Sequence, residues 1–322
     1  MIATFLAVLA LLAGYTEFRR RRILAAHRPT GSFAEIAGER LHYRFVPPDP
    51  GRADLPVLVF LHGASGNLAD LELAFLEPLR GRYPMLFVDR PGLGHSERSD
   101  PLQAAPAAQA RRIAALLEHC GIDRCVAVGH SFGAAVAAAL ALEEPARVRG
   151  LALVAPASHP WPGKVSWYYR FAALPGVGPL LCHTLALPAA ELMAPSSLRG
   201  VFAPGEPPQG YARAIGLPLV FRPRSFRANA CDLAALNDHL AEQAPFYPSL
   251  RQPAVVITGD DDRVVWPTIH AAGLKQDLPN VRLIVLEGAG HMPHHTHGQE
   301  TRTAIAALAE VIARAGQHKT AV

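Results

Sequence analysis

Cysteine is scarce in the 322-residue sequence, which contains only Cys120, Cys125, Cys182 and Cys231. None of them belongs to a C-x-x-C pair or stands at metal-ligand spacing from a histidine, which argues against a zinc site and a disulfide framework. We therefore expect free thiols in a reducing compartment. Charged residues are also few, at 18%, whereas half of the residues are hydrophobic. This balance excludes a disordered or fibrous chain.

Excess positive charge is missing from most of the chain. The first 30 residues hold five arginines and one glutamate, and so account for the whole formal net charge of +4. The remainder is electrically neutral overall. Because a nucleic-acid-binding protein places a basic face on its folded body, we predict no nucleic-acid partner.

An apolar run occupies residues 2–15, relieved only by Thr4 and Gly14, and Arg19–Arg22 follow it. As a helix through Phe18, this segment spans about 26 Å, close to the ~30 Å hydrocarbon layer of a membrane. A secretory signal carries its positive charges before the apolar run, not after it. We predict a single-pass or shallow membrane anchor over 1–18 and a basic linker over 19–31. The positive-inside rule then places the rest of the chain on the cytoplasmic side of the inner or cell membrane. A cleaved signal and a soluble amphipathic helix are the alternatives.

From residue 32 onward, short apolar runs alternate with helical stretches, which is typical of an α/β sheet. We predict strands over 33–36, 41–46, 56–61, 85–88, 125–128, 151–154, 254–258 and 281–286. Helices are predicted over 70–80, 104–119, 132–143, 266–277 and 298–315. Residues 158–249 break this alternation and are rich in proline and aromatic residues, so we predict an inserted helical lid there. The core then comprises 32–157 and 250–316, with a tail over 317–322.

The strongest motif is Gly129-His130-Ser131-Phe132-Gly133, which lies between a predicted strand and a predicted helix. G-x-S-x-G in this context is typical of a nucleophile elbow, where small residues permit a strained turn that exposes the serine hydroxyl. Ser131 is therefore the candidate nucleophile.

A serine hydroxyl needs a base to remove its proton and an acid to orient that base. Two later strands run into candidate residues, the first into Asp260, Asp261 and Asp262 and the second into His291. Because the carboxyl ends of parallel strands meet at one edge of a sheet, these side chains can share a site with Ser131.

Five segments together resemble the α/β-hydrolase-fold serine hydrolases: LHGASGN (61–67), DRPGLGHS (89–96), GHSFG (129–133), TGDDDRVV (258–265) and GAGHMPH (288–294). The resemblance covers about residues 32–316 and implies a mostly parallel sheet flanked by helices, with an inserted helical lid. It implies His291 as the base and Asp262, three residues after the strand-end glycine, as the acid. It also implies an oxyanion hole formed by the backbone N–H groups of Ala64 and Phe132, and a reaction without metal or organic cofactor.

These features predict an esterase- or lipase-like serine hydrolase that cleaves carboxylic esters through an acyl-enzyme on Ser131. Its partner would be a small-molecule ester with an apolar acyl or aryl group. Epoxide hydrolases and dehalogenases of this fold have Asp in place of Ser131, which disfavours their chemistry. C–C bond hydrolases usually have a second glycine where this chain has Ala134. C–C bond hydrolysis, perhydrolase or haloperoxidase chemistry on the same residues, and a non-catalytic ligand-binding role stay open.

Candidate substrate-binding residues lie in the elbow and in the predicted lid. They are His130, Trp161, Tyr168, Arg222 and Arg227. The aromatic side chains would line an apolar pocket, and the arginines would hold a substrate carboxylate. The alternatives are packing of the lid onto the core and pairing of the arginines with lid acids such as Asp232 or Glu206.

Three further histidines, His294, His295 and His297, follow the candidate base. Their spacing departs from the H-E-x-x-H pattern, and no carboxylate in that segment is suitably placed for a shared metal. We predict that they form a polar rim and that the chain holds no metal.

Overall fold

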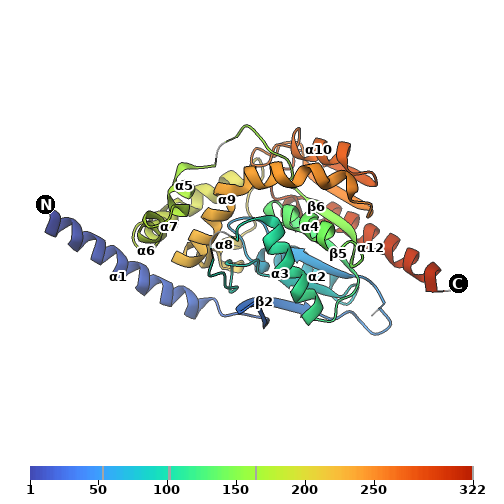
Figure 1. Cartoon of the computed structure of the whole chain (residues 1–322), viewed down its shortest axis with the longest axis horizontal. Coiled ribbons are helices and arrows are strands. Elements are labelled where there is room, and N and C mark those ends of the chain that lie inside the picture. The colour runs from blue at the N-terminus through green and yellow to red at the C-terminus, as the bar shows by residue number, and fades with distance from the viewer. Residues whose placement is uncertain (53, 101–102, 164, 321–322) are drawn as a thin grey trace.

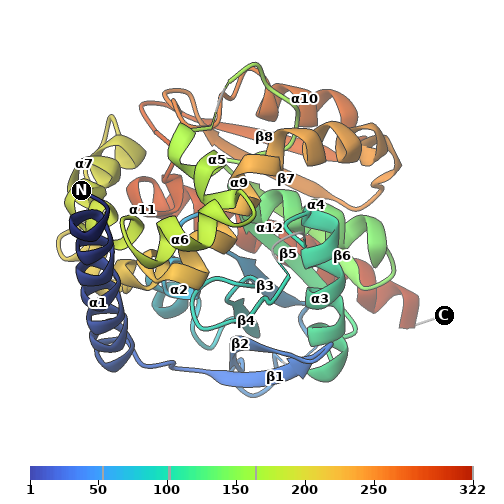
Figure 2. The same ribbon diagram turned by 60° about the vertical axis from the view of Figure 1, so that its left-hand side comes forward.

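The computed structural model describes residues 1–52, 54–100, 103–163 and 165–320. Its sheet has eight strands in the order β1-β2-β4-β3-β5-β6-β7-β8. The pairs β1–β2 and β2–β4 are antiparallel, and all other neighbours are parallel. The strands are β1 (Ser32–Ile36), β2 (Glu39–Val46), β3 (Val57–Leu61), β4 (Met85–Val88), β5 (Cys125–His130), β6 (Val148–Val154), β7 (Ala254–Gly259) and β8 (Val281–Leu286). Helices flank this sheet (Figures 1 and 2), so the predicted fold class is confirmed.

Helices pack on both faces of the sheet because alternate residues of a strand point in opposite directions. Val59 and Leu61 of β3 share a cluster with α3 (Pro106–His119) and α4 (Phe132–Glu143). Leu58 and Phe60 share the opposite cluster with α2 (Leu68–Leu79) and α12 (Gly298–Thr320). The central strands are therefore buried on both faces, which explains why they form continuous apolar runs in the sequence.

Most predicted element boundaries agree with the structure to within a few residues. The helix predicted from residue 266 begins later, as α10 (His270–Asp277), because the Asp262 carboxylate accepts hydrogen bonds from the N–H groups of Val264 and Val265 and holds the chain in a loop. The helix predicted over 298–315 continues as α12 through most of the predicted tail, whose last two residues lie outside the described ranges. The short helix α11 (Pro293–Thr296) precedes it.

The described residues between β6 and β7 form helices and loops, in the segment where the sequence predicts the lid. The elements are α5 (Trp167–Ala173), α6 (Val177–His183), α7 (Ala186–Phe202), α8 (Tyr211–Ala214), η1 (Leu217–Phe221), α9 (Pro223–Gln243) and η2 (Ala244–Ser249). Asp232 of α9 ties this segment to the core, since it pairs with Arg90 at 3.0 Å and with Arg98 at 2.6 Å, and all three side chains are fully buried. The alternative that Asp232 pairs with lid arginines is wrong, because core arginines occupy both of its oxygens.

The N-terminal helix α1 (Ile2–Ala26) is longer than expected and projects from the body at the end of the molecule opposite the C-terminus (Figure 1). The arginines expected in a linker lie within the helix instead. Arginine is a good helix former, and Glu17 pairs with Arg20 and Arg21 one turn along. Within the described residues, α1 is the one continuous helix long and apolar enough to cross a membrane.

Candidate active site

Ser131 lies at the turn between β5 and α4, where the backbone is strained. Its φ is +53°, a left-handed conformation that is uncommon for a residue with a side chain. The flanking glycines make this turn possible: a Cβ on Gly129 would lie 2.3 Å from the Gly133 carbonyl oxygen, and one on Gly133 would lie 2.0 Å from that of Leu61. The motif therefore needs both glycines for close approach of the backbone, as the elbow interpretation requires.

The side chains of Ser131, His291 and Asp262 form a continuous hydrogen-bonded series. The Ser131 hydroxyl lies 3.0 Å from Nε2 of His291, and Nδ1 of His291 donates to Oδ2 of Asp262 at 2.8 Å. The other Asp262 oxygen accepts the two backbone N–H groups of the loop after β7. Asp262 and His291 are each 4% exposed, so the base and its partner are shielded from water. Such a series can remove a proton from the serine hydroxyl.

Two backbone N–H groups beside Ser131 are held in fixed orientations. In a trans peptide the N–H points away from the preceding carbonyl. The Gly63 carbonyl accepts hydrogen bonds from Arg90, at 3.2 Å, and from the His62 ring, at 2.8 Å, so the Ala64 N–H points the other way. The Ser131 carbonyl likewise accepts two backbone N–H groups, which turns the Phe132 N–H away from them.

The loop that contains Ala64 lies against the nucleophile. A Cβ on Gly63 would lie 3.2 Å from the Ser131 Cβ. The lid also holds this loop, because Oδ1 of Asn229 on α9 accepts the Ser65 N–H at 2.7 Å, and the Tyr169 hydroxyl lies 3.4 Å from the Ser65 hydroxyl. The sequence analysis missed Asn229 and Tyr169, since nothing in the local sequence links the lid to residue 65.

His130, expected to bind substrate, is buried behind the candidate base. Its Nε2 donates to the His291 carbonyl at 3.0 Å, and burial lowers the pKa of His130 well below its usual range, so the ring is neutral. Its ring also lies 4.3 Å, between centroids, from that of His294. His130 therefore supports the loop that carries His291, in place of the expected contact with substrate.

Two of the three histidines expected to form a polar rim, His294 and His295, instead contact a buried carboxylate that lies far from them in the sequence. Asp70 of α2 accepts hydrogen bonds from the His295 ring and the Tyr211 hydroxyl, each at 2.7 Å, and lies 3.4 Å from Nε2 of His294. Burial opposes the charge on Asp70, but the two histidines hold its pKa well below its usual range, whereas burial lowers the pKa of His294 to about 4. His297 is absent from this cluster, and its Nδ1 lies 3.0 Å from the Thr296 hydroxyl.

Asp70, His294 and His295 are the one group in the described ranges whose ligand atoms lie close enough together for a metal ion, within 4.8 Å of one another. The Asp70 carboxylate is already satisfied by histidine and tyrosine donors. The cluster therefore acts as a structural link between α2, the loop after His291 and lid helix α8.

Three of the four remaining substrate-binding candidates have structural contacts in the lid or against the core. Trp161 packs against the core with its ring near that of His270, and Tyr168 contacts neighbouring aromatic rings of α5. Arg222 donates to the carbonyls of Leu219 and Gly94 and so caps the turn before α9. The Nε of Arg227 is buried without a hydrogen-bond partner among the described residues. Within the described ranges, no hydrogen bond, ion pair or ring contact joins these four residues to Ser131.

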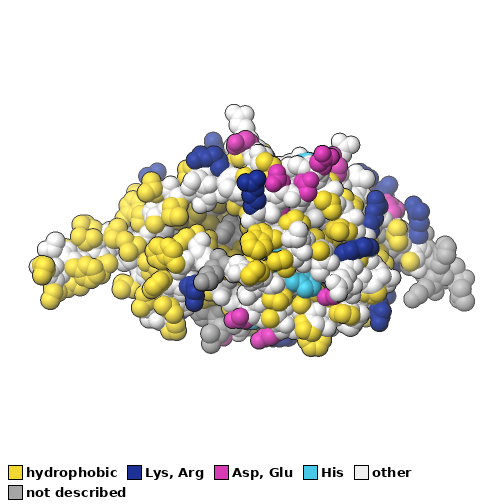
Figure 3. Space-filling model, turned by 90° about the horizontal axis from the view of Figure 1, so that it is seen from above, with side chains coloured by type: hydrophobic (Ala, Val, Ile, Leu, Met, Phe, Trp, Pro, Cys, Tyr) yellow, Lys and Arg dark blue, Asp and Glu magenta, His cyan; other side chains and the backbone are white. Residues whose placement is uncertain are grey.

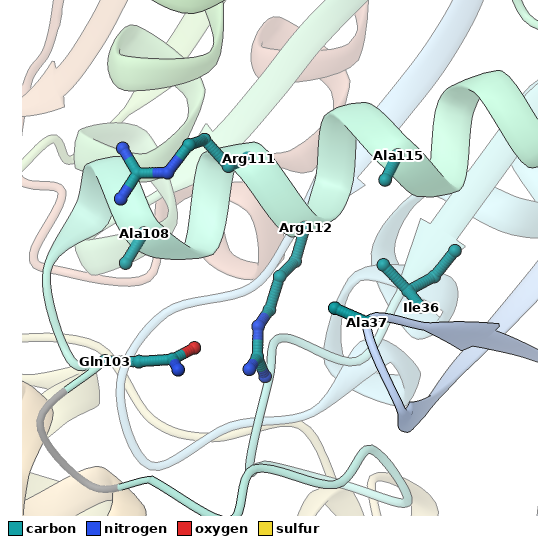
Figure 4. A pocket seen from close by; sticks show the side chains of 7 residues that line it. All are labelled: Ile36, Ala37, Gln103, Ala108, Arg111, Arg112 and Ala115. Atoms are coloured by element: carbon teal, nitrogen blue, oxygen red, sulfur yellow. The ribbon is translucent and has the colours of Figure 1, made fainter.

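Two surface cavities have linings that include none of the series Ser131–His291–Asp262. The larger, of about 510 Å³, lies between the turn after β1 and helix α3, with Arg112 and Gln103 at its edge (Figure 4). Arg112 is paired there with Glu39. The second, of about 420 Å³, lies between α3, α4 and the end of the lid. Neither supplies groups for the chemistry of the candidate site.

Comparison with known proteins agrees with this architecture. The profile of the family described as α/β hydrolase fold matches residues 56–298. Polyketide synthase ThaQ of Burkholderia thailandensis is 30% identical over 253 residues, which cover 74% of this chain and 11% of the synthase, so this chain spans about a tenth of that relative. The crystal structure of the enol-lactonase from Burkholderia xenovorans LB400 is similar with a TM-score of 0.70 and 20% identity, over 85% of this chain and 98% of that one. A membrane phospholipase A is similar with a TM-score of 0.63 and 23% identity, over 97% of both chains. The chain therefore belongs to the α/β hydrolase fold family.

Proposed function

We propose that this protein is a serine hydrolase that cleaves carboxylic esters through an acyl-enzyme on Ser131. One observation carries the proposal: the Ser131 hydroxyl, the His291 ring and the Asp262 carboxylate are joined in series by hydrogen bonds of 3.0 and 2.8 Å. The strained turn at Ser131 adds support, because strain of this kind persists where it presents a reactive group.

The mechanism follows from the direction of these hydrogen bonds. Because Nδ1–H of His291 donates to Asp262, the lone pair of Nε2 faces the Ser131 hydroxyl. His291 takes the hydroxyl proton as Ser131 Oγ attacks the ester carbonyl, and the N–H groups of Ala64 and Phe132 stabilise the oxyanion, each by about 10²–10³-fold in rate. His291 then protonates the departing alcohol. Water activated by the same ring cleaves the acyl-enzyme and releases the acid.

The substrate would be an ester with an apolar acyl or aryl group, presented at the cytoplasmic face of the inner or cell membrane. The exposed apolar residues of α1 support a membrane anchor, and the arginines after them favour the cytoplasmic side. The likeness to the membrane phospholipase A, which covers 97% of both chains, is in keeping with such a location.

The experiment is hydrolysis of p-nitrophenyl esters from C2 to C12 by wild type and by Ser131→Ala, in parallel with a vinylogous diketone and with peroxide. We expect ester turnover with an optimum chain length, and a kcat lower by on the order of 10⁴–10⁶ in the variant. Ser249→Ala, at an exposed serine of η2, is the matched control and should retain activity. Turnover of only the diketone or peroxide would favour the alternative chemistries, and wild-type activity in Ser131→Ala would contradict the proposal.

A further inference from the structure

Three consecutive lid helices expose an unusual number of large apolar side chains. On α5, α6 and α7 these include Trp167, Phe171, Val177, Leu180, Leu192 and Met193, and the exposed fraction reaches 84% at Leu192 and 71% at Trp167. We call this surface the lid face. Scattered apolar residues are normal on a soluble protein, but a contiguous group of this kind marks a site of interaction. Figure 3 shows apolar side chains gathered toward the end of the molecule that carries α1.

Negative charge is nearly absent from the same helices. Residues 166–202 contain a single carboxylate, Glu191, and it is neutralised by Arg19 of α1, with a hydrogen bond from Tyr15 as well. Arg170 and Arg199 lie in the same segment. An apolar surface with basic residues and no free carboxylate suits the boundary between acyl chains and anionic headgroups.

The contacts between α1 and the lid helices determine how deep the lid face would lie in a membrane. The Thr16 hydroxyl donates to the Thr184 carbonyl between α6 and α7, and Arg19 pairs with Glu191 on α7. These contacts lie where the apolar run of α1 ends and its arginines begin, which is the headgroup level of an inserted helix. Figure 2 shows α1 and α7 side by side. The lid face is therefore held at the membrane surface if α1 enters the bilayer.

The shape of α6 and α7 indicates that they lie in the surface and do not cross it. Taken together they are apolar enough for a membrane span, but they are bent by 68° at their junction. With 7 residues, α6 is too short to cross about 30 Å of hydrocarbon, and the 17 residues of α7 include Glu191, Pro195 and Arg199, which a membrane span disfavours. A bent apolar pair at headgroup depth is the geometry of an interfacial segment.

We propose that the lid face is a second membrane-contact surface, whose α5–α7 side chains enter the interfacial layer of the lipid bilayer that α1 anchors. The occupant is lipid.

The test uses the full chain with an environment-sensitive NBD label at Leu192→Cys or Leu180→Cys, in a Cys120→Ser background, since Cys120 is the least buried native thiol. Val311→Cys on α12 is the matched control, because Val311 is an apolar residue with the same 54% exposure as Leu180. Helix α12 leads to the C-terminus, at the end of the molecule opposite α1 (Figure 1). The proteins are reconstituted into phosphatidylcholine–phosphatidylglycerol vesicles with and without brominated acyl chains.

Labels on the lid face should show blue-shifted emission and be quenched by bromolipid about fivefold more strongly than the control label, because interfacial side chains enter about 5–10 Å into the bilayer. Water-like emission at positions 180 and 192 would overturn the proposal. A blue shift without bromolipid quenching would also overturn it, since a second copy or another protein would then cover the face. Quenching does not depend on turnover, so p-nitrophenyl acetate hydrolysis by the same samples separates failure of this inference from failure of the proposed function.

Discussion

Acid should destabilise this protein through histidines that are buried in the neutral form. Nδ1 of His270 accepts hydrogen bonds from two backbone N–H groups, those of Ser158 and His159, at 3.2 and 3.1 Å. A protonated ring cannot accept either of them. Burial accordingly lowers the pKa of His270 to about 4, with the nearby His159 acting in the same direction. The His62 ring is held in the same way, since its Nε2 accepts the Arg90 N–H at 3.0 Å, and burial lowers its pKa to about 4.

The sign follows from proton linkage. The unfolded chain, with histidine pKa values of about 6.5, binds more protons than the folded one, so the free energy of unfolding rises with pH. Stability is complete above about pH 7 and is lost as the pH falls from about 6.5 toward 4. At pH 5 each such histidine costs about 2 kcal/mol relative to pH 8, and the two together about 4 kcal/mol. That is a large part of the 5–15 kcal/mol typical of a folded domain.

His270→Asn isolates one of these contributions, because the asparagine amide oxygen can accept the same N–H groups and does not titrate. The assay is urea unfolding of wild type and variant in the same detergent at pH 7.5 and pH 5. The loss of unfolding free energy between these pH values should be smaller by about 2 kcal/mol in the variant. The reasoning would be refuted if both proteins lost the same unfolding free energy, or if wild type were more stable at pH 5 than at pH 7.5.

Three further substitutions and one control test the site and the residues that support it. Gly133→Ala places a Cβ against the Leu61 carbonyl and should lower the free energy of unfolding in urea by about 3 kcal/mol or more. The control is Gly200→Ala in α7, where the space around the glycine is open, and it should raise the free energy of unfolding by up to about 1 kcal/mol. Equal effects of the two substitutions would contradict the account of the elbow. Asp70→Asn removes the charge that holds three buried donors and should cost about 2 kcal/mol in the same assay at pH 7.5, and an unchanged midpoint would argue against the link. Asp262→Asn should lower kcat by about 10⁴-fold in the ester assay while the protein stays folded by circular dichroism, so wild-type turnover would exclude Asp262 as the orienting acid.

The elements that position the candidate site could be predicted because their signals are local. Ser131, Asp262 and His291 each follow an apolar strand, and parallel topology brings those strand ends together. The buried contacts that hold the site in place could not be predicted in this way. Asp70 lies more than 200 residues before His294 in the chain, and a single sequence gives no pattern that joins them.

The contacts of the lid show the same limit. Arg222 and Arg227 stand in an arginine-rich segment that favours a role as a carboxylate clamp, but Arg222 is occupied by backbone carbonyls and Asp232 by arginines of the core. The sequence also underestimates the length of α1, because the change from apolar to charged residues marks the end of the apolar run but not the end of the helix. Pairing of Glu17 with Arg20 and Arg21 lets the helix continue.

The central claim is the acyl-enzyme on Ser131, and the most direct test is to trap it. Wild type and Ser131→Ala are mixed with the p-nitrophenyl ester of optimal chain length, quenched in acid during the first turnover, and digested for mass spectrometry. The account predicts one acyl group on the peptide that contains Ser131 in wild type and none in the variant. An acyl group on another residue, or ester turnover that persists in Ser131→Ala, would contradict it.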